Sequence, residues 1–134
     1  MAGVPINPYW VLYSGGWDGS SDLRKSFLLN AQGDQVPALD LSVGRSGACS
    51  VILQQNGQRT QVGVLGGYDG NDYLSSMERY NCVFTGQTPA CTKATDGPAM
   101  NFARYYFGCG TLQTSQVSPY YVTSQRICQV RDPP

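Results

Sequence analysis

The fold of this 134-residue chain is decided by the stretch Val62-Gly63-Val64-Leu65-Gly66-Gly67-Tyr68-Asp69-Gly70, which is soon followed by Leu74-Ser75-Ser76-Met77-Glu78-Arg79-Tyr80-Asn81. A short apolar run, a Gly-Gly pair, a polar loop and a second strand-like run predict a β-hairpin with a glycine-rich connection. A second copy of this pattern stands 51 residues earlier, and residues 15–23 are identical to residues 66–74 at five of nine positions. The chain is therefore built from a repeat.

A second element also recurs, because residues 45–53 resemble residues 104–112 and each copy has an arginine eight residues before a leucine. The offset of this pair is 59 rather than 51, so about eight extra residues lie between the second Gly-Gly hairpin and Arg104. Cys82 and Cys91 enclose eight residues, which places the insertion between them. We therefore predict a Cys82–Cys91 disulfide that closes an inserted loop.

The cysteine content leaves the compartment of the protein open. Five cysteines favour an oxidising, extracellular setting, and their odd number leaves one thiol free or paired outside the chain. Cys49 and Cys109 can pair with each other or with Cys128, although alternation along a strand points them to opposite faces. The first residues have no signal-peptide pattern, which favours a cytoplasmic protein or a truncated N-terminus.

Composition excludes several classes of function. Nine basic residues balance nine acidic residues without a charged block, so nucleic acid is not an expected partner. The absence of histidine excludes His-dependent triads and His-ligated metal sites. The Asp69-Gly70-Asn71-Asp72 loop lacks the spacing of a calcium loop, and no metal or other cofactor is expected. No apolar run is long enough to span a membrane.

The stretch from Val62 to Gly70, with the Glu78-Arg79-Tyr80 segment after it, closely resembles a Kelch repeat, and a spacing near 50 is the kelch period. The resemblance implies an all-β fold of four-stranded antiparallel propeller blades. Within a partial Kelch-repeat domain over 1–134, we expect a degenerate repeat at about 9–44, the best repeat at about 45–99, the start of a third at about 100–124, and a tail at 125–134.

Two departures from the family pattern bear on this prediction. The tryptophan that usually follows Glu-x-Tyr and packs between blades is missing, and Cys82, Val83 and Phe84 are candidates to replace it. Propellers close with about four to eight blades, whereas this chain supplies about two. We therefore expect a fragment of a longer propeller, in preference to an assembly of identical copies.

The repeated residues have expected roles. A structural turn role is predicted for Gly15, Gly16, Asp18, Gly66, Gly67 and Asp69. The resemblance implies a partner-binding role for Arg45, Arg104, Tyr68, Tyr73 and Trp17, because Kelch partners are often gripped by an arginine and by residues of the loop after Gly-Gly. The alternative is that the arginines satisfy backbone carbonyls and the aromatics cover their own loops. Glu78 is expected to be architectural, and Tyr105-Tyr106-Phe107 is expected to pack in the core.

The resemblance therefore implies a non-catalytic module that binds a protein or peptide through its blade loops, and no enzyme activity. Two alternatives remain open. The chain could be a segment of a kelch-type propeller enzyme related to galactose oxidase, or of a secreted adhesion or matrix protein.

Overall fold

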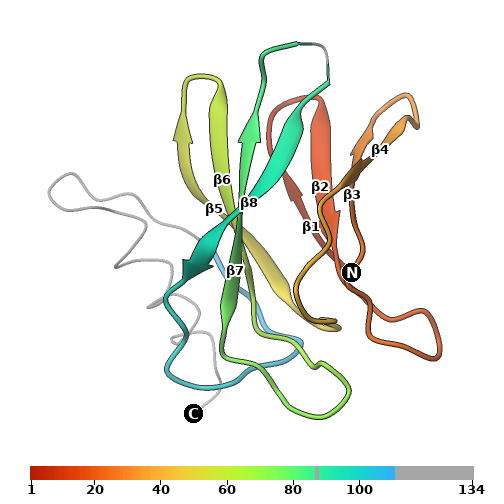
Figure 1. Cartoon of the computed structure of the whole chain (residues 1–134), viewed down its shortest axis with the longest axis vertical. Helices are drawn as coiled ribbons and strands as arrows, with labels where there is room; N and C mark the ends of the chain where they lie inside the picture. The colour runs from red at the N-terminus through yellow and green to blue at the C-terminus, as the bar shows by residue number, and fades with distance from the viewer. Residues whose placement is uncertain (87, 111–134) are drawn as a thin grey trace, which may run out of the picture.

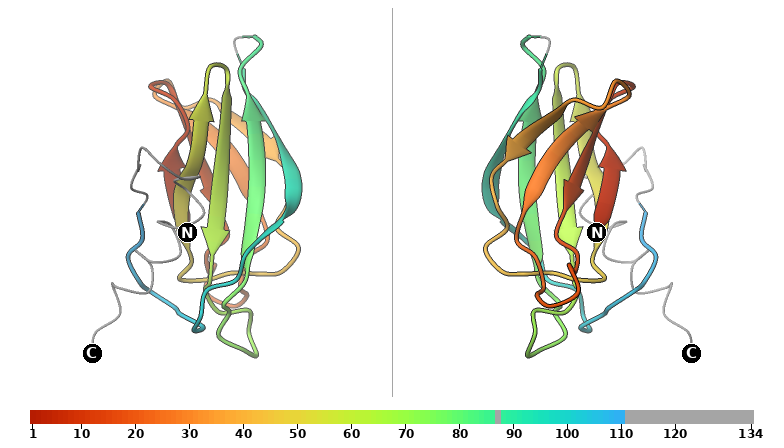
Figure 2. Two further views of the ribbon diagram at one scale, coloured as in Figure 1. Left: turned by 90° about the vertical axis from the view of Figure 1, so that its left-hand side faces the viewer. Right: turned by 90° about the vertical axis from the view of Figure 1, so that its right-hand side faces the viewer.

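The computed structural model describes residues 1–86 and 88–110, which form two four-stranded antiparallel sheets placed face to face (Figures 1 and 2). The first sheet has the order β1-β2-β3-β4, and the second has the order β5-β6-β7-β8. The strands of the first sheet are β1 Ala2–Pro5, β2 Trp10–Ser14, β3 Ser26–Asn30 and β4 Gln35–Ala38. Those of the second are β5 Cys49–Asn56, β6 Arg59–Leu65, β7 Met77–Val83 and β8 Ala90–Gly97. This part of the chain contains no helix, and so none that could cross a membrane.

The predicted all-β architecture of four-stranded antiparallel sheets is confirmed, with differences at its borders. The first sheet begins at Ala2 rather than near residue 9, because β1 pairs with β2. No strand forms over residues 100–110, where the start of a third repeat was expected. Most of that expected repeat, 111–124, and the expected tail, 125–134, lie outside the described residues.

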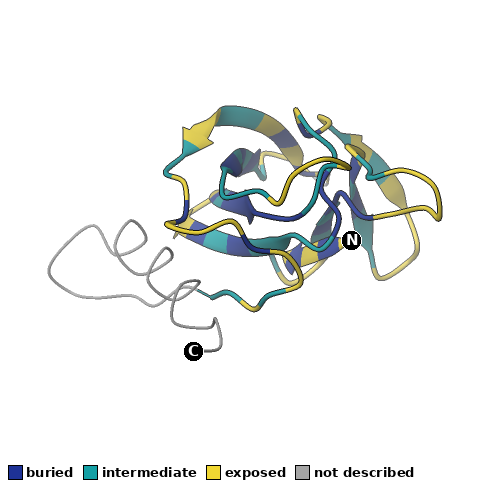
Figure 3. Cartoon of the chain, turned by 90° about the horizontal axis from the view of Figure 1, so that it is seen from below, coloured by how far each residue is buried: buried dark blue, intermediate teal, exposed yellow. Residues whose placement is uncertain are grey.

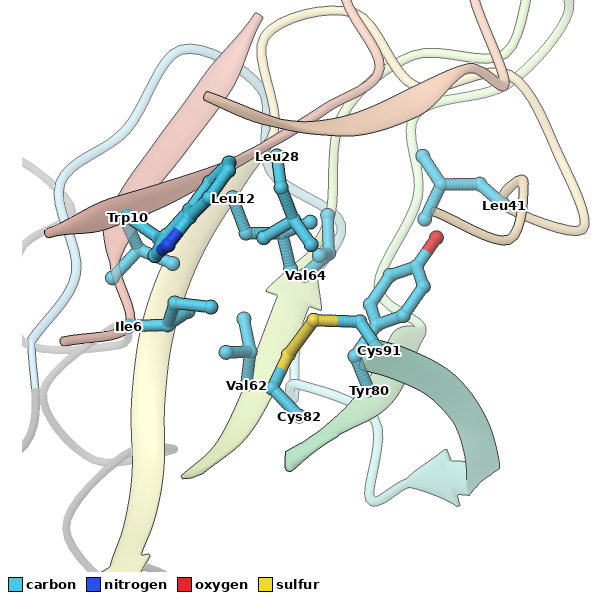
Figure 4. Packing of buried hydrophobic residues seen from close by; sticks show 11 residues of the cluster. Ile6, Trp10, Leu12, Leu28, Leu41, Val62, Val64, Tyr80, Cys82 and Cys91 are labelled. Atoms are coloured by element: carbon cyan, nitrogen blue, oxygen red, sulfur yellow. A yellow bond between two sulfur atoms is a disulfide. The ribbon is translucent and has the colours of Figure 1, made fainter. Parts of the chain in front are cut away.

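The main hydrophobic core lies between the two sheets (Figure 4). In β2 and β3, alternate residues such as Leu12 and Leu28 face the second sheet, since successive side chains of a strand point to opposite faces. On the second sheet, the side chains of Val62, Val64 and Tyr80 belong to the same core, and each is completely buried. The sheets are thus joined by side-chain packing rather than by strand pairing.

The missing inter-blade tryptophan is replaced by a disulfide and by a tryptophan from the first sheet. Cys82 and Cys91 lie directly opposite each other on β7 and β8, and the predicted disulfide between them is formed. Both cysteines belong to the inter-sheet core, together with Trp10 from β2 and the partly buried Phe84. Figure 4 shows the disulfide beside Val62 and Tyr80.

A second disulfide joins Cys49, at the start of β5, to Cys109. This resolves the alternatives for these two cysteines, while Cys128 lies outside the described residues. The expectation that they point to opposite faces assumed that both stand on strands. Cys109 instead follows an irregular segment that crosses the outer face of the second sheet, where Phe107 and Cys109 pack against a smaller core of Val51, Leu53, Leu65, Met77 and Met100.

The Gly-Gly pairs end β2 and β6 at equivalent places. Gly16 N–H donates to the Arg45 carbonyl at 2.7 Å, and Gly67 N–H donates to the Arg104 carbonyl at 2.8 Å. Gly66 has a φ of +66°, and a Cβ there would lie 2.7 Å from the Arg104 oxygen. Glycine is therefore required both by the left-handed backbone and by the close approach of the next segment.

Replacement of Gly66 by alanine tests this close approach. Gly57 is the matched control, because its φ of +60° is similar but a Cβ there would meet nothing within 4 Å. We expect Gly57→Ala to lower the free energy of unfolding by about 1 kcal/mol through backbone strain alone. Gly66→Ala should lower it by about 3 kcal/mol, since overpacking adds to the strain. Urea unfolding followed by tryptophan fluorescence measures both; equal losses would show that the contact is unimportant.

Candidate functional site

Three segments meet at one end of the molecule, which we call the loop end. They are the β2–β3 loop (15–25), the β6–β7 loop (66–76) and the segment that follows β8 (98–110). Main-chain hydrogen bonds close the first two loops, from Leu23 N–H to Gly16 O and from Leu74 N–H to Gly67 O. Others join the second loop to the third segment, among them Arg104 N–H to Leu74 O. Figure 3 views the molecule from this end and shows exposed residues along the loops.

Asp18 and Asp69 shape the two loops in the same way. Asp18 Oδ1 accepts hydrogen bonds from the main-chain N–H groups of Ser20 and Ser21 at 2.9 and 2.8 Å. Asp69 Oδ1 accepts from Asn71 and Asp72, each at 2.8 Å. These bonds hold the pKa of both carboxyls below its usual value. Both aspartates thus serve the turns, as Asp side chains commonly do.

Four tyrosines gather at the loop end, and we call them the tyrosine cluster: Tyr68, Tyr73, Tyr105 and Tyr106. The ring centroids of Tyr68 and Tyr73 are 5.2 Å apart, those of Tyr73 and Tyr105 are 5.5 Å apart, and those of Tyr105 and Tyr106 are 4.2 Å apart. Tyr73 and Tyr106 are 60% and 72% exposed, so much of this aromatic area faces solvent. The structure thus brings together two predicted residues, Tyr68 and Tyr73, with two tyrosines that were expected in the core.

A hollow of about 350 Å³ at the opposite end is lined by polar residues of β5, β6 and β7, whereas the hollow at the loop end, of about 320 Å³, is mainly aromatic. We call the latter the loop pocket. It is lined by Trp17, Asp22, Ser46, Tyr68, Tyr105 and Tyr106. Trp17, which was predicted to contact a partner, is 62% exposed. The pocket therefore combines residues of both Gly-Gly loops with Ser46 and with the segment that follows β8.

The wall formed by Tyr105 and Tyr106 is fixed by contacts far from it in sequence. Tyr106 N–H donates to the Gly47 carbonyl at 2.8 Å, and the Cys49–Cys109 disulfide lies just beyond. Tyr106 is the single non-glycine residue with positive φ, 53°, in the described part of the chain. Such strained backbone persists where the surrounding structure imposes it, and it is frequent at binding sites.

Tyr105-Tyr106-Phe107 was expected to pack in the core, and that expectation is wrong for two of the three. Tyr105 and Tyr106 are 40% and 72% exposed, while Phe107 does pack against the smaller core. The expectation assumed strand alternation, but these residues form no strand. Partial burial raises the pKa of Tyr105, and its hydrogen bond with Tyr106 and the charge of Asp22 raise it further. Its hydroxyl is therefore neutral at neutral pH.

Arg45 is buried, which is at odds with the partner-binding role predicted for it. Its side chain is only 2% exposed. Nη1 donates to the carbonyls of Gly66 and Ser76 at 2.9 and 3.1 Å, and Nε forms a salt bridge with Glu78 at 3.0 Å. Arg45 thus takes the alternative role, in which the guanidinium satisfies backbone carbonyls.

Arg104 is buried as well, with 5% of its surface exposed and its guanidinium 5.8 Å from the ring centroid of Phe102. The structure presents neither arginine to solvent. The partner-binding role predicted for Arg45 and Arg104 is at odds with this burial, because neither guanidinium group lines the loop pocket.

Glu78 is the acceptor at the centre of the Arg45 network, and it has the architectural role expected from the sequence. It is fully buried and accepts hydrogen bonds from Lys93 Nζ, from Ser42 N–H at 2.7 Å and from Arg45. Burial alone would raise the pKa of Glu78, but these three donors outweigh it and hold the pKa below the ordinary value. Glu78 is thus ionised at neutral pH.

Tyr80 stands two residues along the same strand and faces the first sheet. Its hydroxyl donates to the Leu39 carbonyl and shares a 2.9 Å hydrogen bond with Ser26 Oγ. Burial raises the pKa of Tyr80 to about 12. Glu78 and Tyr80 therefore tie β7 to the link between the sheets and to β3.

Comparison with models of protein families matches residues 64–87 to the Kelch motif. The chain contains a Kelch motif. No curated protein matches the chain. The motif covers the end of β6, the Gly-Gly turn, the loop with Tyr68 and Tyr73, and β7 with Glu78 and Tyr80. Kelch repeats generally mediate protein–protein interaction, and the loop pocket uses residues of this one.

Sequence reasoning missed Asp22, Ser46, Tyr105 and Tyr106 as pocket residues. One signal was available, because the repeat aligns Tyr105-Tyr106 with Ser46-Gly47. Large aromatics that replace small residues at equivalent positions mark a local change of environment. Among the described residues, no three His, Cys, Asp or Glu side chains gather where they could hold a metal ion.

Replacement of Glu78 by glutamine tests the buried network. It leaves Arg45 without its carboxylate, so we expect the free energy of unfolding at pH 7 to fall by about 3 kcal/mol. The folded-state pKa of Glu78 lies below 4.5, so its contribution is complete above pH 4.5 and is lost as the pH falls through the folded-state pKa. The difference between wild type and variant should therefore shrink in acid. Urea unfolding across pH 3–7 measures it, with the exposed Asp96→Asn as control; a constant difference would contradict this role.

Proposed function

We propose that the chain is a non-catalytic Kelch-type module that binds a protein or peptide at its loop end, and that further propeller blades cover the outer faces of its two sheets. The observation that supports binding most directly is the cluster of exposed aromatic side chains around the loop pocket. Aromatic residues are enriched among the few residues that dominate binding energy at protein interfaces. The pocket volume, about 320 Å³, suits one or two side chains of a partner.

The need for further blades is supported by the equivalence of the two sheets. The 51-residue offset places Phe27 at the position of Glu78, and Leu29 at that of Tyr80. Glu78 and Tyr80 are buried against the first sheet, whereas Phe27 and Leu29 lie half-buried on its outer face, where Phe27 stacks on Tyr13 with centroids 5.4 Å apart. An apolar sheet face of this kind requires a cover.

Selection of peptides from a displayed random library tests the binding function. The folded full-length chain serves as bait, and recovered peptides are measured against Tyr73→Ala and Tyr9→Ala. Tyr73 is 60% exposed in the tyrosine cluster, while Tyr9 is 74% exposed on the β1–β2 connection at the opposite end. We expect Tyr73→Ala to weaken binding by about tenfold and Tyr9→Ala to leave it unchanged. Recovery of no peptide, or equal loss in both variants, would contradict the proposal.

Light scattering at several concentrations tests the proposed cover of the outer faces. If the face around Phe27 needs a cover, the mass of the 14.5 kDa chain should rise with concentration without settling on a fixed copy number. Phe27→Asp should reduce this association by placing a charge on the face, and Tyr9→Asp should not. A monomer at every concentration would show that the face needs no cover, and a ring of fixed size would show that identical copies supply it.

A further inference from the structure

The loop pocket has an unusual balance of charge for a site first expected to contain arginines. Among its six lining residues, all within the described part of the chain, Asp22 is the one acidic residue and none is basic. The others contribute three tyrosine rings, one indole and one serine hydroxyl. Arg45 and Arg104 are buried away from it. The pocket is therefore aromatic with one negative group.

Asp22 lies where the β2–β3 loop approaches the β6–β7 loop. Its main chain pairs with Trp17 in an isolated bridge, which fixes it relative to the indole. A Cβ on Gly70, in the loop of the second sheet, would lie 3.2 Å from the carboxylate oxygen Oδ2 of Asp22. The charge of Asp22 is also close enough to raise the pKa of Tyr105. The carboxylate thus stands between the two Gly-Gly loops and beside the aromatic rings.

The aromatic wall is preorganised rather than free to collapse. Gly47 has a φ of +66°, and a Cβ there would lie 2.7 Å from the Tyr105 ring, so the ring packs directly on the glycine. The Cys49–Cys109 disulfide and the hydrogen bond from Tyr106 to Gly47 fix both ends of the short segment. Preorganised groups lose little conformational entropy when a ligand binds.

Faces of tyrosine and tryptophan rings attract cations through the negative potential of the ring, and a carboxylate adds direct attraction. An acidic ligand would meet a like charge with no cation among the lining residues to offset it. We propose that the loop pocket binds the cationic side chain of a lysine or arginine of a protein partner, between its aromatic rings and the Asp22 carboxylate. This inference rests on the proposed binding function and gives it a ligand chemistry.

Two blocked peptides that differ in one charge provide the probe: acetyl-Gly-Ser-Lys-Ser-Gly-amide and the same peptide with norleucine in place of lysine. A third carries arginine. The full-length chain is titrated with each, and the NMR signal of the Trp17 indole N–H is followed. Trp10, the other tryptophan, is 7% exposed in the core and serves as an internal reference. We expect saturable shifts with lysine and arginine, and binding of norleucine weaker by roughly tenfold.

Two variants separate the carboxylate from the rings. Asp22→Asn should weaken binding of the lysine peptide by roughly 5- to 30-fold and leave the norleucine peptide unchanged. Tyr106→Leu, at a 72% exposed position, should weaken it by roughly 2- to 5-fold. Asp96→Asn removes an exposed carboxylate on β8 and should have no effect. If Asp22→Asn fails to fold, as judged by the Trp10 signal, Tyr106→Leu carries the test alone.

The inference is overturned if the norleucine peptide binds as well as the lysine peptide, if neither charged peptide gives a saturable shift, or if Asp22→Asn and Tyr106→Leu both leave binding unchanged. Its failure is distinguishable from failure of the proposed function. Library peptides that need Tyr73 but contain no basic residue would overturn the cation preference alone. Absence of any Tyr73-dependent peptide would overturn the binding function itself.

Discussion

The relative position of the two sheets depends on one buried arginine, Arg45. Arg45 lies in the link between β4 and β5, and its main chain is bonded to the β2–β3 loop of the first sheet: its N–H donates to the Leu23 carbonyl at 3.0 Å, and its carbonyl accepts from Gly16 N–H. Its guanidinium reaches the second sheet, where Glu78 and two carbonyls surround it. A buried charge is tolerated only when it is paired and hydrogen-bonded, so this set of partners fixes the relative position of the sheets. Because Ser46 and Gly47 follow Arg45 directly, the position of Arg45 also places these two residues at the loop pocket.

The same main-chain geometry recurs at Arg104, and this recurrence creates the pocket. Arg104 N–H donates to the Leu74 carbonyl at 3.1 Å and its carbonyl accepts from Gly67, as at Arg45 one repeat earlier. The following residues therefore leave the loops in the same direction in both repeats. Where the earlier repeat has Ser46 and Gly47, the later one has Tyr105 and Tyr106. Ser46 and Gly47 are small and leave space, whereas Tyr105 and Tyr106 are large and form a wall beside that space. The loop pocket therefore arises because equivalent positions of the two repeats hold residues of different size.

Local features were predictable from the sequence, and features set by distant contacts were not. The Gly-Gly turns, the capping aspartates and the Cys82–Cys91 bridge depend on neighbours in the same hairpin, so repeat spacing and turn chemistry suffice to predict them. Burial of Arg45 depends on Glu78, 33 residues away, and the sequence left two roles open. Exposure of Tyr105 and Tyr106 depends on Gly47 and on a disulfide that spans 60 residues. Strand alternation could not apply to a segment held in this way.

The degenerate first repeat restricts what can cover the first sheet. If identical copies closed a ring, Arg104 of one copy would lie beside the first sheet of the next copy. Its place there would correspond to that of Arg45 beside the second sheet of its own chain. The position of Glu78 is occupied there by Phe27, so the first sheet would offer an aromatic ring where the second sheet offers a carboxylate. Phe27 stacks on Tyr13, and together they present apolar surface. A neighbour with apolar residues opposite these two rings covers that surface by hydrophobic packing. The pattern therefore favours further, non-identical blades over a ring of identical copies.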